Sequence, residues 1–126
     1  MLATKPWIYG KMANDSALIA LLGSTDNITD AWPEVFTIFP MVIYTEDNQS
    51  DWEWRDNTPS GSDCRIKNDI FTKLDGPTTT NIGINIARIM GGLSFGCGKN
   101  GEVPDQTEGV RHRVMRFNRA LVTSNI

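Results

Sequence analysis

The fold is decided by residues 82–93, which read IGINIARIMGGL. Their apolar side chains recur at i, i+4, i+7, i+8 and i+11, which places them in one stripe along a helix: Ile82, Ile86, Ile89, Met90 and Leu93. Pro77 and Thr78 precede the stripe as helix-start residues, and two glycines weaken its end. We therefore expect a helix here that covers one face of a sheet.

Strand-like segments precede this helix. Residues 41–44 are apolar and rich in β-branched and aromatic side chains, which is typical of a central strand. Residues 63–71 alternate Cys64, Ile66 and Ile70 with polar side chains, and this alternation predicts a half-buried strand. Residues 35–39 also favour a strand, which Pro40 would end.

The two ends of the chain complete the expected set of elements. Residues 5–22 carry apolar side chains near helical spacing, but Asn14-Asp15-Ser16 interrupts them, so two short helical pieces are expected before Gly23. Residues 110–122 favour a strand with Val110, His112 and Val114 on one side and Met115, Phe117 and Leu121 on the other. We interpret this change of side as a β-bulge near Val114 and Met115.

These elements predict an α+β fold, with a mixed, mostly antiparallel sheet of four to five strands and two main helices packed on it. The length of 126 residues fits a single domain over residues 1–126. Two irregular segments are expected within it. One is an extended acidic hairpin or loop at residues 46–62, and the other is a glycine-rich loop at residues 94–109.

Charge is unevenly distributed along the chain. Residues 1–109 hold 8 Lys and Arg against 15 Asp and Glu, a net charge of −7, whereas residues 110–126 hold four arginines and no carboxylate. Complementary patches on one molecule favour contact with further copies or with a partner. The arginines could instead form cross-strand ion pairs within the chain, with Asp69 or Glu46 for example.

The acidic segment is unusual because it also carries tryptophans. Glu46, Asp47, Asp51, Glu53 and Asp56 face only one cation, Arg55, while Trp52 and Trp54 lie two residues apart. Large amphipathic rings on a charged loop are enriched at protein interfaces, although one or both could fold back onto the sheet. The acids lack the ligand spacing of an EF-hand loop.

The usual catalytic and ligand-binding motifs are weak. Cys64 and Cys97 do not form a disulfide framework or a zinc cluster with the lone His112. Residues 96–101 match GxGxxG, but a helix precedes them where a dinucleotide site needs a strand. His112 lies between two arginines rather than beside a nucleophile. We therefore expect no enzyme, no cofactor, no metal and no catalytic residue.

The sequence also indicates where in the cell the protein is made. No apolar run approaches the roughly 20 residues that cross a membrane. Lys5-Pro6-Trp7 leads directly into amphipathic sequence, without the basic and apolar segments of a secretory signal. We expect no membrane association and an intracellular site of synthesis.

Five segments in order carry a family resemblance: residues 18–23, 39–44, 66–71, 82–93 and 112–117. In this order and spacing the chain resembles the tail-completion or tail-terminator proteins of long-tailed bacteriophages, which join head to tail. The resemblance implies a small α/β protein that forms a ring, expected to be a hexamer, at the head-proximal end of the tail tube. Such a ring ends tube polymerisation and joins tail to head.

The resemblance also implies partners and a location. The expected partners are further copies of the chain, the tail-tube protein and the head connector protein, and DNA would pass through the ring without specific binding. The expected location is the neck region of the virion tail, and the host cytoplasm during assembly. The family has no catalytic residues to carry over, and its projecting loop corresponds to residues 46–62. Both the glycine-rich segment 96–101 and the two tryptophans depart from the family pattern.

The predicted subunit or partner interface combines the arginines of the last strand with the acidic segment. It comprises Arg111, Arg113, Arg116, Arg119, Glu46, Asp47, Asp51, Trp52, Glu53 and Trp54. Two alternatives remain open. One is a head-side connector or head-completion ring, and the other is a phage nucleic-acid-binding accessory protein, against which the net charge of −3 argues.

Overall fold

The structure, a computed structural model, describes residues 4–33, 38–55, 58–73, 78–104 and 109–122, and it places the side chains of residues 6–33, 38–46, 64–73, 78–104 and 109–119. The elements in chain order are α1 (Thr4–Ala13), α2 (Ser16–Leu22), the 3-10 helix η1 (Thr25–Asn27), β1 (Ile28–Thr29), β2 (Met41–Arg55), β3 (Thr58–Lys73), α3 (Thr79–Gly92), β4 (Gly96–Val103) and β5 (Val110–Val122).

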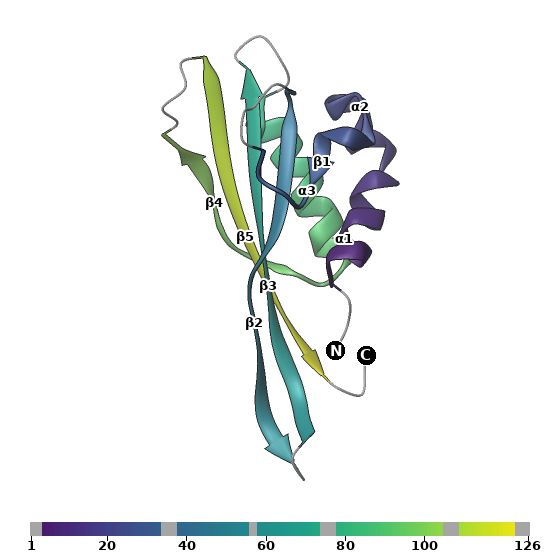
Figure 1. The fold of residues 1–126 in the computed structure, drawn as a ribbon, viewed down its shortest axis with the longest axis vertical. Coiled ribbons are helices and arrows are strands. Elements are labelled where there is room, and N and C mark those ends of the chain that lie inside the picture. The colour runs from purple at the N-terminus through teal and green to yellow at the C-terminus, as the bar shows by residue number, and fades with distance from the viewer. Residues whose placement is uncertain (1–3, 34–37, 56–57, 74–77, 105–108, 123–126) are drawn as a thin grey trace.

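The strands form one five-stranded sheet in the order β1-β2-β3-β5-β4. The short β1 runs parallel to β2, and the other pairs are antiparallel. The helices lie together on one side of the sheet (Figure 1). The predicted fold class, α+β with a mixed and mostly antiparallel sheet, is confirmed.

The first helical region divides at Asp15, as predicted. The Asp15 side chain accepts a hydrogen bond from the backbone N–H of Leu18 at 3.0 Å, which caps the N-terminus of α2. Gly23 ends α2 with a left-handed backbone, φ 88°, a conformation that glycine adopts without steric cost.

Helix α3 supplies the main contact between the helices and the sheet. Thr78 caps it by accepting a hydrogen bond from the N–H of Asn81 at 3.1 Å. Ile82, Ile86 and Met90 are fully buried, so the predicted apolar stripe faces the sheet. The main core therefore lies between the helices and one face of the strands.

Strands β2 and β3 form one long hairpin that includes residues 46–62. A register irregularity lies between Glu46 and Asn48. The far end of the hairpin extends beyond the helices (Figure 1). The pair Gly61–Val122 is the last contact of β3 with β5, so within the described chain the tip of the hairpin is two-stranded.

The prediction of a glycine-rich loop at 94–109 is wrong over β4. This segment is an edge strand paired with β5, with an irregularity between Cys97 and Lys99. Its glycines hydrogen-bond through the backbone like any other residue, and β5 supplies the partner that local sequence does not reveal. Residues 105–108 lie outside the described residues.

The predicted bulge near Val114 and Met115 is also wrong, because the β3–β5 register runs without a shift. Met115 and Phe117 belong to the main core. On the opposite face Met41, Ile43 and Phe71 form a second small cluster, against which Val110 packs. Strand β5 therefore carries apolar side chains on both faces, and in the sequence this pattern resembles the change of side that a β-bulge would cause.

The predicted strand at residues 35–39 is wrong at residues 38 and 39, the two that the structure describes. Ile38 and Phe39 form a bend before the cis Phe39–Pro40 peptide bond. Residues 34–37 lie outside the described residues.

Candidate interaction surface

The four arginines of β5 do not form one surface. Strand alternation places Arg111, Arg113 and Arg119 on the face that carries the helices, because they share parity with the core residues Met115 and Phe117. Arg116 lies on the opposite face, on which none of the described helices packs (Figure 1). We call this second side of the sheet the open face.

Arg113 binds the N-terminal turn of α3. Its guanidinium donates to Thr79 Oγ1 at 3.3 Å, to Thr80 Oγ1 at 3.1 Å and to Asn100 Oδ1 at 2.8 Å. Thr79 in turn donates to Glu102 Oε1 at 2.7 Å. That hydrogen bond, together with the charges of Arg111 and Arg113, holds the pKa of Glu102 below its usual value.

Arg119 binds the other end of the same helix. It donates to the carbonyl oxygen of Leu93 at 2.8 Å, and its guanidinium lies 5.6 Å from the ring centre of Trp7. A cation is favourable at this helix terminus because the backbone carbonyls there carry partial negative charge. Arg113 and Arg119 thus anchor α3 to β5 within one subunit.

A buried carboxylate that contacts an imidazole lies on the open face. The Asp69 side chain is fully buried, its Oδ1 lies 2.7 Å from His112 Nε2, and its Oδ2 lies 3.7 Å from Lys67 Nζ. The His112 ring stacks on Phe71 with centroids 4.2 Å apart, and Trp32, half exposed, packs edge-on against Phe71 at 5.7 Å. His112 is therefore held in one orientation by a carboxylate and an aromatic ring.

A row of cations crosses the open face next to this pair. Lys67 on β3, Arg116 on β5 and Lys99 on β4 are direct cross-strand neighbours. Like charges directly opposite one another are unfavourable in a sheet unless anions meet them. Asp69 meets Lys67 from within the sheet at 3.7 Å, and Lys99 is exposed at the edge strand.

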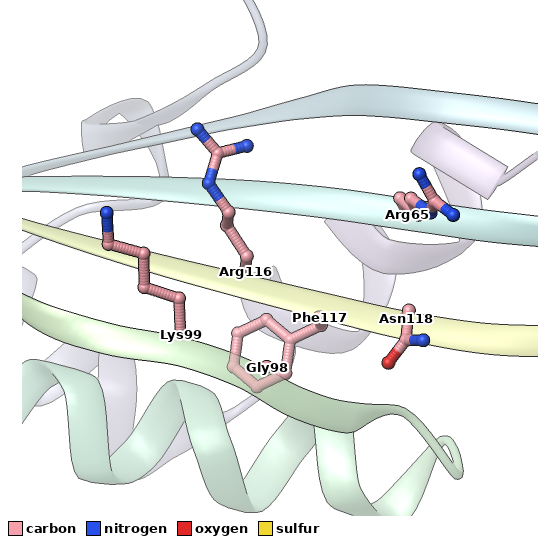
Figure 2. A pocket seen from close by; sticks show the side chains of 6 residues that line it. All are labelled: Arg65, Gly98, Lys99, Arg116, Phe117 and Asn118. Atoms are coloured by element: carbon pink, nitrogen blue, oxygen red, sulfur yellow. The ribbon is translucent and has the colours of Figure 1, made fainter.

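The row borders an open hollow of about 350 Å³. Figure 2 shows side chains around it from three adjacent strands, with Arg65 from β3, Lys99 from β4 and Arg116 from β5. Gly98, at the β4 irregularity, contributes no side chain and leaves the space open. We call this site the basic hollow; it is lined by Arg65, Gly98, Lys99, Arg116, Phe117 and Asn118.

The acidic part of the predicted interface lies on β2. Glu46 is exposed at the irregularity that opens the long part of the hairpin. The backbones of Asp47, Asp51, Trp52, Glu53 and Trp54 belong to the same strand, and their side chains lie outside the described set. The interface as a whole stays a prediction.

Sequence reasoning did not include Arg65, Lys67 or Lys99 in the predicted interface. Residues 65 and 67 alternate with buried Cys64 and Ile66, which indicates that they leave the core. Their alignment with Arg116 and Lys99 depends on the pairing of strands that are distant in sequence. The residues of each strand do not show which other strand it pairs with.

The described residues were also compared with the requirements of a metal site, a membrane span and a disulfide. Within the described ranges no group of three or more His, Cys, Asp or Glu side chains is placed to hold a metal ion. No helix in the described part of the chain is long and apolar enough to cross a membrane. Cys64 is buried and Cys97 exposed, and neither forms a disulfide.

Comparison with known proteins adds a match of fold. No protein-family model matches the sequence, and no curated protein matches it significantly. Eleven chains of solved structures match significantly. One belongs to a structure described as the virion of a native gene transfer agent particle, with a TM-score of 0.68, 16% identity and coverage of 91% of each chain. The chain therefore shares its fold, over nearly its whole length, with a chain of that virion.

Proposed function

We propose that this protein is a structural component of a phage-like virion and that it forms a ring at the head-proximal end of the tail tube. There it would end tube polymerisation and join tail to head. The observation that carries the proposal is the fold shared with a chain of the gene transfer agent virion over 91% of both chains. The order of sequence segments that resembles tail-completion proteins supports the same role.

The arrangement of surfaces fits ring assembly. A head-to-tail contact needs two different, complementary surfaces on each subunit, and it gives a closed ring when the rotation closes. The open face offers the cations of the basic hollow and, elsewhere, the half-exposed Trp32 packed against Phe71. The β2–β3 hairpin offers an acidic segment that extends beyond the helices (Figure 1).

The proposed partners follow from the position in the particle. Further copies of the chain would form the ring, expected to be a hexamer, and its two faces would contact the tail-tube protein and the head connector protein. DNA would pass through the channel. No catalysis is part of this role.

Electron microscopy of particles assembled without this protein tests the role. Over-long tails, or tails without heads, are expected for a tail terminator. Filled heads that lose their DNA would instead support the alternative of a head-completion ring. Normal particles would contradict both.

A further inference from the structure

The basic hollow has the features of a docking site rather than of a solvated charged surface. Arg65 and Lys99 are exposed at its rim, and the cations come from three adjacent strands spaced about 4.8 Å apart. The hollow itself is about 350 Å³, and the aliphatic parts of Arg65, Lys99 and Arg116 give its walls apolar surface, whereas the ring of Phe117 is buried in the main core. A partner that fits it would combine a bulky apolar group with flanking carboxylates.

The chain itself contains such a segment. Residues 51–54 read Asp-Trp-Glu-Trp, within a stretch at 46–56 that has five carboxylates and one arginine. An indole beside Arg and Lys side chains gains a cation–π attraction, and Trp in a pocket is a frequent anchor of protein interfaces. Adjacent carboxylates would meet the cations at the rim.

The hairpin of the same subunit runs away from its own hollow. Trp52 pairs with Gly61, and Trp54 pairs with Pro59, both further along the hairpin than Arg65. Four residues of extended strand separate Gly61 from Arg65, about 13 Å. A 51–54 segment that fills the hollow must therefore come from another copy of the chain.

We propose that the basic hollow of one subunit binds the 51–54 segment of the hairpin of a second copy, with an indole in the hollow and carboxylates on Arg65 and Lys99. This contact rests on the ring proposed above and would set the register between its neighbours. An isolated two-stranded hairpin is marginally stable in water, so docking would also stabilise the hairpin tip. Because hairpin and hollow are different surfaces, the contact is head-to-tail.

Paired charge reversals in the full chain test the contact. One variant carries Arg65→Glu and Lys99→Glu, and the other carries Asp51→Lys and Glu53→Lys. Sedimentation velocity over a concentration series should show self-association weakened at least about tenfold in each. All four substitutions in one chain should restore it. An equimolar mixture of the two variants should also associate, because the hairpin of the first meets the hollow of the second unaltered.

Two further variants separate charge from shape. Lys11→Glu makes the same charge change as Lys99→Glu on α1, on the other side of the sheet, and should leave association unchanged. Gly98→Leu fills the hollow without a charge change, since a Cβ at Gly98 would meet only the Arg116 carbonyl oxygen at 3.9 Å. It should weaken association about as much as Lys99→Glu. Thermal unfolding confirms that each variant is folded.

Several outcomes would overturn the proposal. These are a wild-type chain that stays monomeric to its solubility limit, a fourfold variant that fails to reassociate, or equal effects of Lys11→Glu and Lys99→Glu. Salt-dependent binding of duplex DNA that the hollow variant loses, with self-association intact, would assign the hollow to phosphate instead. Each of these results leaves the microscopy of particles that lack the protein as a separate test of the tail role.

Discussion

At the scale of single residues, Asp69 is a demanding position in the sheet because its carboxylate is buried. Its carboxylate is fully buried between Ile43 on β2 and Val114 on β5, and His112 is its closest partner. Removing one partner of a buried hydrogen bond costs more than replacing both by apolar groups, because a buried polar group is left without its hydrogen bond. The Asp69–His112 pair is thus a point where one substitution has a large effect.

His112→Ala is therefore expected to lower the free energy of unfolding by about 1–3 kcal/mol. The double variant His112→Ala with Asp69→Val should recover much of this loss, because a valine side chain at the second position would continue the apolar row of its neighbours. Urea unfolding of both variants measures the difference. A double variant less stable than the single one would contradict this account of the pair.

Asp15 couples the start of α2 to α3. Both terminal nitrogens of Arg88 donate to its carboxylate at 2.8 Å, and these hydrogen bonds hold the pKa of Asp15 below its ordinary value of 3.8. Because the folded pKa is lower than the unfolded one, the stabilisation is present above the unfolded pKa. It is lost as the pH falls through the folded pKa.

Asp15→Asn should keep the cap and remove this part of the acid sensitivity. Unfolding free energies measured from about pH 6 down to about pH 2 should fall less steeply than in the wild type. Asp15→Ala should cost about 1 kcal/mol more at neutral pH, because it also removes the cap. If the unfolding free energies of wild type and Asp15→Asn fell equally steeply with pH, the Asp15–Arg88 pair would not contribute to the pH dependence of stability.

The residue scale shows where sequence is informative. Thr78 was predictable as a helix start, and Asn14-Asp15-Ser16 as a break between two helices, because a cap depends on residues three positions away. The contact of Arg113 with Thr79 was not predicted, because 34 residues separate the two. The sequence indicated only that these arginines needed a partner of some kind.

At the scale of elements, α3 approaches β5 closely at one glycine. A Cβ at Gly83 would lie 3.2 Å from Met115 Sδ and 3.3 Å from Arg113 Cδ, whereas Gly91 on the same helix has nothing within 4 Å. Alanine is favoured over glycine in a helix by up to about 1 kcal/mol. The two glycines therefore differ in what an added methyl group meets.

Gly91→Ala should raise the free energy of unfolding by about 0.5–1 kcal/mol. Gly83→Ala should gain less or lose stability, because the added methyl presses on the β5 side chains, and Gly83→Leu should be clearly destabilising. Chemical unfolding of the three variants gives the order. Equal gains at both glycines would contradict the close packing of α3 on β5.

The end of α3 gives a second test at this scale. Arg119→Met keeps an unbranched side chain but loses the bond to the Leu93 carbonyl, and it should cost about 1–2 kcal/mol. Arg111→Met is the matched control, because Arg111 is half exposed and its contact with Glu102 is as long as 3.4 Å, so its cost should stay within about 0.5 kcal/mol. Faster amide exchange in the last turn of α3 should accompany the first variant only.

Elements with strong local patterns were predictable, and those that depend on a neighbour were not. The stripe of α3 and the alternation of β3 carry their own periodicity. Strand β4 has a glycine-rich sequence of low strand propensity, and it is a strand because β5 offers it hydrogen bonds. The wrong prediction of a bulge in β5 also arose from contacts that are distant in sequence, since sequence alone does not show that both faces of the sheet carry apolar clusters.

At the scale of the whole molecule, the division of charge seen in the sequence becomes a division in space. The basic end of the chain does not form one basic patch, because strand alternation sends Arg113 and Arg119 to the helices and Arg116 to the open face. Lys67 and Lys99 complete the row around Arg116 from other strands. The sequence thus indicated a charged surface, but its members depend on the register of three strands.

The position of β5 also constrains how the protein is made. This strand lies inside the sheet, between β3 and β4, yet the ribosome synthesises it after every other described element. Until it leaves the exit tunnel, β4 lacks its strand partner, β3 presents an unpaired edge, and α3 lacks both arginine anchors. Stalled nascent chains should remain protease-sensitive until β5 has emerged, and then become resistant in one step; resistance gained before that length would contradict this order of events.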